Sequence, residues 1–100
     1  MQPKIRHIVS FCLKHEKGSP QAAKFIADSK AILGGIPNVA VFDQCEQVSP
    51  KNDFDYVFVF DFMSEADYAA YNAHPAHVQY VRERWDTEVA RFQETDLKEL

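Results

Sequence analysis

The sequence predicts one α+β domain whose elements follow the order strand, helix, strand, strand, helix, strand. Three observations lead to this prediction. The chain has 100 residues, which supports one hydrophobic core but not two. Short stretches alternate apolar and polar residues, as half-buried strands do. Two longer stretches carry apolar residues at helical spacing, each behind a helix-starting signal. Residues 1–100 are therefore expected to form a single domain.

The first strand is expected at residues 5–13, where every second side chain suits the core. The first helix is expected at residues 20–33, because Ser19 is a good N-cap and Pro20 fits the first helical position. Gly34 and Gly35 then end this helix. The core-facing side of the first strand consists of Ile5, His7, Val9, Phe11 and Leu13.

The second and third strands are expected at residues 39–45 and 54–62, joined by a turn rich in Ser, Pro and Asn. The third strand carries the most unusual pattern in the chain. Aromatic residues make up 13% of the sequence, and a row of them occupies every second position of this strand. Its other face is also partly apolar, which is typical of a central strand covered on both sides. The aromatic row comprises Phe54, Tyr56, Phe58, Phe60 and Phe62.

The second helix is expected to begin at about Glu65, after the N-cap Ser64, and to break before Pro75. Because proline cannot donate a hydrogen bond to the preceding turn, we expect Pro75 to start a renewed helix with His74 as its N-cap. The renewed helix should run to about residue 86 or 89. The last strand is expected at residues 89–96, although residues 87–91 suit either a helix or a strand.

This order of elements is the split βαβ arrangement called ferredoxin-like, in which a four-stranded antiparallel sheet carries two helices on one face. The other face of the sheet would be bare, and Ile8, Val57 and Val59 on it are apolar. An apolar face on so small a protein favours a second copy as its cover. We therefore expect a homodimer formed by sheet-to-sheet packing.

Charge and composition disfavour several other partners. The net charge of −4 leaves no basic surface for nucleic acid. The three glycines form no phosphate-binding loop, which disfavours a nucleotide cofactor. We expect no cofactor of another kind either. No apolar stretch has the length of a membrane span or a signal peptide, so we expect no membrane partner and a cytoplasmic location. Cys12 and Cys45 are expected to be reduced and buried.

The segment at residues 74–77 is the main candidate for chemistry. His77 would lie in the first turn of the renewed helix, where the helix dipole disfavours imidazolium and keeps the ring available as a base. Tyr71 could point its hydroxyl into the same space, and His7 on the first strand could complete a polar set. The plainer interpretation is that the histidine caps a helix or bonds to the backbone, and that Tyr71 packs in the core with its hydroxyl satisfied. A zinc or nickel site is a third interpretation, but His74 as an N-cap would point away, so we expect no metal.

The aromatic row also has two interpretations. Large side chains under two helices can be core packing alone. They can also form the wall of a cavity for a flat apolar ligand, because the space between a sheet and its helices is a common small-molecule site.

The sequence resembles the stress-responsive A/B barrel domain family, abbreviated Dabb, over nearly its whole length. The resemblance lies in residues 5–9, in residues 36–39 with Phe42, and in residues 54–56. Its most specific part is residues 71–78, which read Tyr-Asn-Ala-His-Pro-Ala-His-Val. It implies a dimeric α+β barrel in which two sheets meet and each subunit has a cavity between sheet and helices.

The resemblance also implies candidate site residues. Most members of the family have no established activity, but one plant member is a polyketide cyclase that performs an aldol condensation without a cofactor. The match implies that His77 is a catalytic base and that Tyr71 is its partner. Tyr56 and Phe58 stand where that cyclase has a histidine and a valine, which implies a smaller or differently shaped cavity. The expected substrate-binding residues are His7, Phe11, Tyr56, Phe58 and Trp85.

Three functions remain open from the sequence. The first is a pocket for a small apolar or aromatic carbonyl compound, with aldol, cyclase-type or lyase chemistry at His77. The second is a stress-related binding dimer without turnover, in which Phe58 and Phe60 fill the pocket. The third is a cofactor-independent monooxygenase. The sequence does not decide whether the protein is an enzyme.

Overall fold

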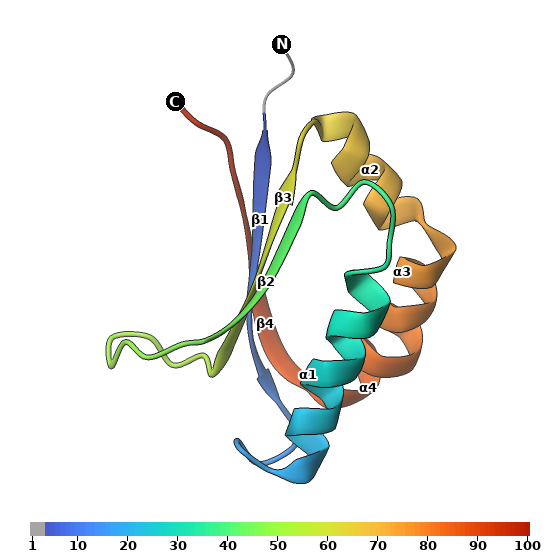
Figure 1. Cartoon of the computed structure of the whole chain (residues 1–100). Coiled ribbons are helices and arrows are strands. Elements are labelled where there is room, and N and C mark those ends of the chain that lie inside the picture. Colours follow the sequence, from blue (N-terminus) through green and yellow to red (C-terminus); the bar gives the residue numbers. More distant parts are fainter. Residues whose placement is uncertain (1–3) are drawn as a thin grey trace.

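The computed structural model describes residues 4–100, and its strands form one antiparallel sheet in the order β2-β3-β1-β4. The strands are β1 (Ile5–Leu13), β2 (Val41–Glu46), β3 (Tyr56–Phe62) and β4 (Val89–Leu97). All the helical segments lie on one side of this sheet, and the opposite side carries no helix within residues 4–100 (Figure 1). The expected ferredoxin-like fold is confirmed, with β3 as an interior strand.

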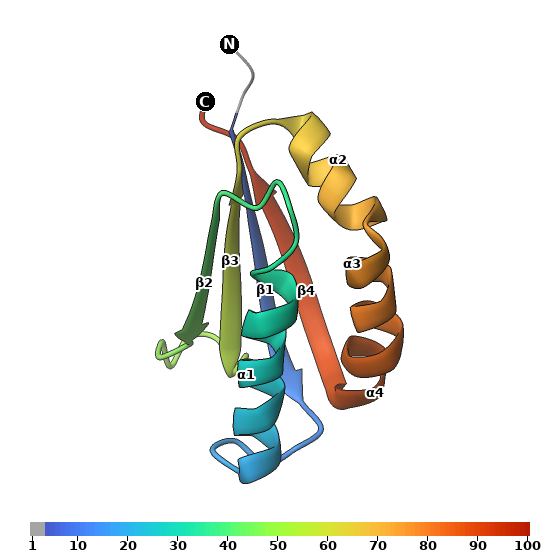
Figure 2. The same ribbon diagram turned by 45° about the vertical axis from the view of Figure 1, so that its right-hand side comes forward.

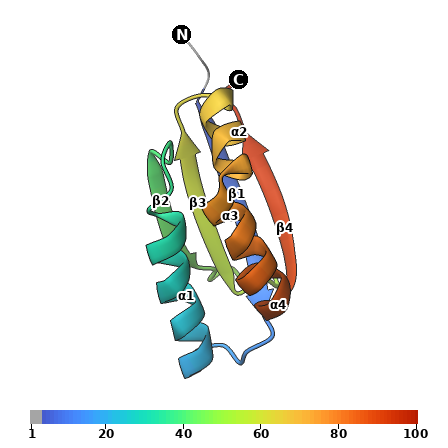
Figure 3. The ribbon, with the colours of Figure 1, turned by 90° about the vertical axis from the view of Figure 1, so that its right-hand side faces the viewer.

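The helices form two arms across the sheet. One arm is α1 (Pro20–Leu33), and the other joins α2 (Glu65–Ala73), α3 (Pro75–Tyr80), the π-helical turn η1 (Val81–Trp85) and α4 (Asp86–Glu88). The two arms lie side by side over the sheet in Figures 2 and 3. The expected caps are present: Ser19 Oγ accepts from the Ala22 amide at 3.2 Å, and His74 Nδ1 accepts from the Ala76 amide at 3.1 Å.

Two strands begin later than expected. β2 starts at Val41 instead of residue 39, because Asn38 adopts a left-handed conformation (φ 75°) that forms a turn. β3 starts at Tyr56, so Phe54 precedes the strand instead of belonging to the aromatic row. The Phe54 ring packs under the Arg91 guanidinium, whose central carbon lies 4.4 Å from the ring centroid.

The core lies between the sheet and the two arms, and the aromatic row supplies much of it. Phe58, Phe60 and Phe62 are each at most 2% exposed, as are Phe11 of β1 and Phe25 of α1. Burying a side chain of this size contributes roughly 1.5–3 kcal/mol relative to leaving it in water. These rings therefore stabilise the fold and at the same time define the space beneath the helices.

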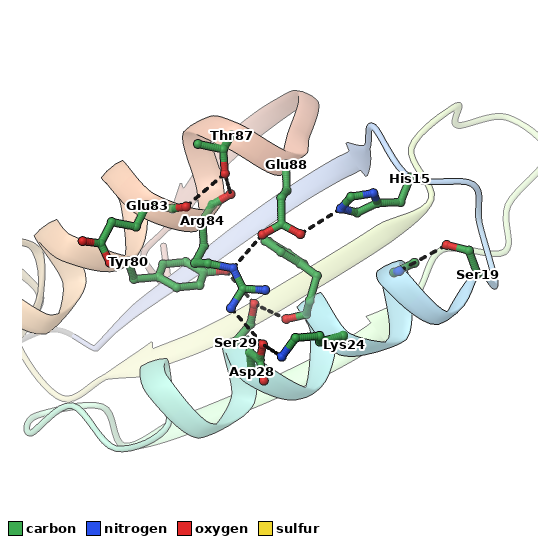
Figure 4. Close-up of polar contacts among 12 residues, drawn as sticks. His15, Ser19, Lys24, Asp28, Ser29, Tyr80, Glu83, Arg84, Thr87 and Glu88 are labelled. Atoms are coloured by element: carbon green, nitrogen blue, oxygen red, sulfur yellow. Dashed lines mark hydrogen bonds and ion pairs between the residues drawn. The ribbon is translucent and has the colours of Figure 1, made fainter.

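A chain of polar contacts holds the second arm against the first (Figure 4). Arg84 donates through Nε to Glu88 Oε2 at 2.6 Å and through Nη1 to Asp28 of α1 at 2.8 Å. His15, in the loop after β1, contacts Glu88 Oε1 at 2.8 Å. Because Arg84 belongs to η1, these contacts also hold the neighbouring Trp85 over the sheet.

The helix-free face of the sheet is partly apolar and partly charged. Ile8, Val57 and Val59 on it are half-buried. Asp61 is 4% exposed and pairs with Arg6 of β1, with Oδ1 to Nε at 2.9 Å. The hydrogen bond from Arg6 lowers the pKa of the Asp61 carboxyl below its usual range.

The two cysteines are free, as expected, but the expectation that they are buried is wrong for both. Cys12 is half-buried, whereas Cys45 is exposed because it lies on the edge strand β2. Within residues 4–100, no helix combines the length and the apolar content that a bilayer span requires.

Candidate functional site

A pocket of about 220 Å³ lies between the sheet and the second helical arm. Phe58 and Phe60 line it from β3, and Trp85 lines it from η1. His7, Tyr71 and His77 supply polar groups to the same space. An apolar cavity of about 150 Å³ is large enough to bind benzene, so this pocket has room for a substituted ring. Mostly apolar walls with a few convergent polar groups are typical of small-molecule sites.

The break between α2 and α3 sets the orientation of His77. In a continuous helix, the Ala76 amide would donate to the carbonyl of Asn72. Here that amide donates to His74 Nδ1, so the Asn72 carbonyl is available to His77 Nδ1 at 3.1 Å. A carbonyl oxygen can only accept, so Nδ1 carries the ring proton. Nε2 then keeps its lone pair and is the ring nitrogen available to a ligand.

His77 and Tyr71 lie in contact, with ring centroids 4.5 Å apart. Burial lowers the pKa of His77 below the ordinary imidazole value of 6.5, which keeps the ring neutral near neutral pH. Burial raises the pKa of Tyr71 far above the ordinary tyrosine value, so its hydroxyl stays protonated. The pair therefore presents a neutral base beside a hydrogen-bond donor.

The Tyr71 hydroxyl has no hydrogen-bond partner among residues 4–100, although the side chain is 2% exposed. Within the same residues, no fully enclosed side-chain nitrogen or oxygen lacks a partner. This hydroxyl is therefore not fully enclosed, and Tyr71 is one of the residues that line the pocket. A carbonyl oxygen in the pocket is a suitable acceptor for it.

A second polar cluster surrounds His7 and includes residues that the sequence did not reveal. His7 Nδ1 lies 2.5 Å from Asp96 Oδ1, and Tyr68 donates to Asp96 Oδ2 at 2.9 Å. Burial and the neighbouring Asp96 carboxylate raise the pKa of the Tyr68 phenol. The cluster depends on the pairing of β1 with β4, which sets His7 opposite Asp96. A register shift between Cys12 and Leu13 interrupts that pairing, so strand alternation alone could not predict it.

The structure brings most of the expected site residues to one pocket, but not all of them. His7, Phe58, Tyr71, His77 and Trp85 line it. Phe11 does not line the pocket. It is fully buried and packs against Trp85, with the two ring centroids 4.9 Å apart. Tyr56 lies at a separate depression beside α1. Tyr80, Asp86 and Glu94 line the pocket without having been expected there.

The described residues offer no arrangement for a metal ion. Among residues 4–100, no three or more His, Cys, Asp or Glu side chains are grouped closely enough to hold one. His74, which a metal site would share with His77, has its Nδ1 occupied by the cap. The polar side chains that line the pocket are able to transfer protons and to form hydrogen bonds.

The fold and the pocket define a class: small ferredoxin-like α+β proteins with a cavity between sheet and helices. Residues 5–99 match the model of the Stress Responsive A/B Barrel Domain, and the chain belongs to this family, Dabb. No match was found among curated proteins.

Solved structures show the same fold. A Dabb family protein with a ferredoxin-like fold from Mesorhizobium loti is 44% identical, over 99% of each chain, with a TM-score of 0.97. A dimeric ferredoxin-like protein of unknown function from Thermobifida fusca is 20% identical, over 99% of this chain and 93% of that one, with a TM-score of 0.79. A hydroxynitrile lyase from Passiflora edulis is 17% identical, over 100% of this chain and 96% of that one, with a TM-score of 0.83.

Proposed function

We propose that the protein binds a small apolar or aromatic carbonyl compound in this pocket and that His77 acts on it as a base. The observation that carries the proposal is the hydrogen bond from His77 Nδ1 to the Asn72 carbonyl. It leaves Nε2 unprotonated in a pocket that also holds the Tyr71 hydroxyl. The pocket is open, with Phe58 and Phe60 along its wall, which supports a ligand-binding role over a purely structural one.

The proposed reaction begins when the substrate carbonyl oxygen accepts a hydrogen bond from Tyr71. His77 Nε2 then removes a proton from the adjacent carbon, the electrons of that C–H bond form an enolate, and His77 becomes imidazolium. The enolate carbon attacks a second carbonyl carbon, and the imidazolium returns its proton to the new alkoxide. No electrons leave the substrate, so aldol or cyclase-type chemistry of this kind requires no redox cofactor.

The same pair of groups suits the reverse direction. If His77 takes the proton of a β-hydroxyl group, the C–C bond breaks and the electrons return to an enolate that Tyr71 stabilises. A lyase among the proteins that share the fold is compatible with this direction. We propose aldol or lyase chemistry as the reaction type, without a cofactor.

We also propose that the protein forms a homodimer through the helix-free face of the sheet. Ile8, Val57 and Val59 supply apolar side chains there, and no helix within residues 4–100 covers them. The T. fusca protein with this fold is described as dimeric, which supports the proposal.

Deuterium exchange at the methyl group of an aryl methyl ketone tests the catalytic step. The probe is para-acetylbenzamide in deuterated buffer, followed by proton NMR. Wild type should accelerate loss of the methyl signal, and His77→Gln should reduce the acceleration by roughly 10²- to 10⁴-fold, because the base is removed. Lys51→Gln, at an exposed residue outside the pocket, is the control and should keep the wild-type rate. Equal rates in wild type and His77→Gln would refute the role of His77.

A further inference from the structure

The pocket has an unusual charge balance that bears on which substrates it accepts. Two carboxylates, Asp86 after η1 and Glu94 on β4, line it. Among the described residues that line the pocket, none is a lysine or an arginine. A ligand in this space therefore meets negative charge without a permanent positive charge to oppose it.

The two histidines do not supply the missing positive charge. His77 is kept neutral, because burial lowers the pKa of its ring. The His7 ring already pairs with the Asp96 carboxylate, with Nδ1 2.5 Å from Oδ1. Tyr71 and Tyr80 remain protonated and neutral, because burial raises the pKa of each phenol.

Nearby basic side chains are bound elsewhere. Arg84 precedes Trp85 in the chain, but its guanidinium is held by Glu88 and Asp28 at 2.6 and 2.8 Å, toward α1 (Figure 4). Lys98, near the end of β4, pairs with Glu65 at 2.5 Å. Neither is free to neutralise an anionic ligand without losing an existing ion pair.

From this balance we propose that the pocket selects carbonyl compounds that are neutral or carry a cationic substituent, and that it rejects carboxylates and phosphates of the same shape. This inference rests on the proposed function for the position of the carbonyl, at Tyr71 and His77. The ring would lie against Phe58, Phe60 and Trp85, and its substituent would approach Asp86 and Glu94. The volume of about 220 Å³ favours a single ring with small substituents.

Three para-substituted acetophenones of nearly equal shape test the inference. They are para-acetylbenzamide (neutral), para-acetylbenzoate (anionic) and para-acetylbenzamidine (cationic). Their dissociation constants for wild-type protein would be measured by calorimetry at low salt. We expect the amide to bind roughly tenfold tighter than the benzoate, and the amidine to bind at least as tightly as the amide. Added salt should narrow these differences, because it screens charge.

Matched variants assign the selectivity to the two carboxylates. Glu94→Gln and Asp86→Asn should each lower the amide-to-benzoate affinity ratio by roughly threefold, because each removes one negative charge near the ligand. Glu83→Gln is the control: it makes the same change in net charge, but Glu83 does not line the pocket. It should leave the ratio within about 1.5-fold of wild type, because a charge farther from the ligand is screened more strongly.

The outcomes separate this inference from the proposed function. Equal or tighter binding of the benzoate, or a ratio that Glu83→Gln lowers as much as Glu94→Gln, would overturn the charge selectivity while leaving methyl exchange intact. The expected order of binding without any methyl exchange would support the selectivity and refute the catalytic role of His77. Failure of all three probes to bind would overturn both.

Discussion

At the scale of single residues, the orientation of His77 follows from a change of hydrogen-bond partners within residues 72–77. His74 Nδ1 accepts a hydrogen bond from the Ala76 amide, and the Asn72 carbonyl accepts one from the N–H at His77 Nδ1. Pro75 permits this change of partners, because it starts a new helix and has no backbone N–H to donate. The order of residues in this segment therefore determines the tautomer of the base.

The first prediction concerns the pH dependence of methyl exchange. Only the neutral imidazole accepts a proton, and burial lowers the pKa of His77 below 6.5. The rate should therefore stay constant near neutral pH and fall as the pH drops through this lowered pKa. Because the pKa of Tyr71 is raised above the ordinary 10.0, the plateau should continue to at least that pH. A rate that halves near pH 10 would contradict the assignment of Tyr71 as the donor.

The second prediction isolates the hydroxyl of Tyr71. Tyr71→Phe should slow methyl exchange by about 10²-fold or more, because the enolate oxygen loses its donor. Tyr80→Phe removes another phenol from the pocket lining, one that is bonded to Ser29 at 2.6 Å. It should lower the free energy of unfolding by about 1 kcal/mol and leave exchange within about threefold of wild type. Comparable loss of exchange in both variants would argue against a specific role for Tyr71.

At the scale of elements, the junction between α2 and α3 is a helix cap that also positions the site. The third prediction is that His74→Ala lowers the free energy of unfolding by about 1 kcal/mol, because the cap is lost. The Ala76 amide is then free to return to Asn72, so methyl exchange should fall and its pH profile should shift. His74→Asn restores a capping group and should recover both properties. Loss of stability with unchanged exchange would show that His74 acts only on the fold.

Much of the fold was predictable because its signals are local. The alternation of apolar and polar residues predicted β1, and Ser19 with Pro20 predicted the start of α1. The starts of β2 and β3 were not predictable, because Asn38 forms a turn and Phe54 leaves the row to pack under Arg91. The π-helical turn before α4 has no clear local signal.

Some residues of the candidate site could be predicted from the local sequence, and others could not. His77 and Tyr71 lie within one segment, where the helix-breaking Pro75 and the family resemblance identify them. Asp96 and Glu94 reach the site only through the pairing of β1 with β4, and a register shift in that pairing hides them from strand alternation. Their positions depend on tertiary structure, which the local pattern does not encode.

At the scale of the whole molecule, the helix-free face of the sheet accounts for the proposed homodimer. The fourth prediction is that Val59→Glu converts the dimer to a monomer in light scattering, because the added carboxylate, opposite Ile8, would be desolvated at the proposed interface without a partner. Val78→Glu is the matched control, since Val78 lies on α3 and is 47% exposed. It should leave the dimer intact. A wild-type protein that stays monomeric at high concentration would refute the proposed interface.

In the proposed binding mode, a carbonyl compound places its oxygen at Tyr71 and its acidic carbon at His77. A crystal structure of wild-type protein with para-acetylbenzamide tests this most directly. We expect the ketone oxygen within about 3.2 Å of Tyr71 Oη and the methyl carbon about 3.5 Å from His77 Nε2. A ligand bound outside this pocket, or bound with its ketone turned away from both side chains, would contradict it.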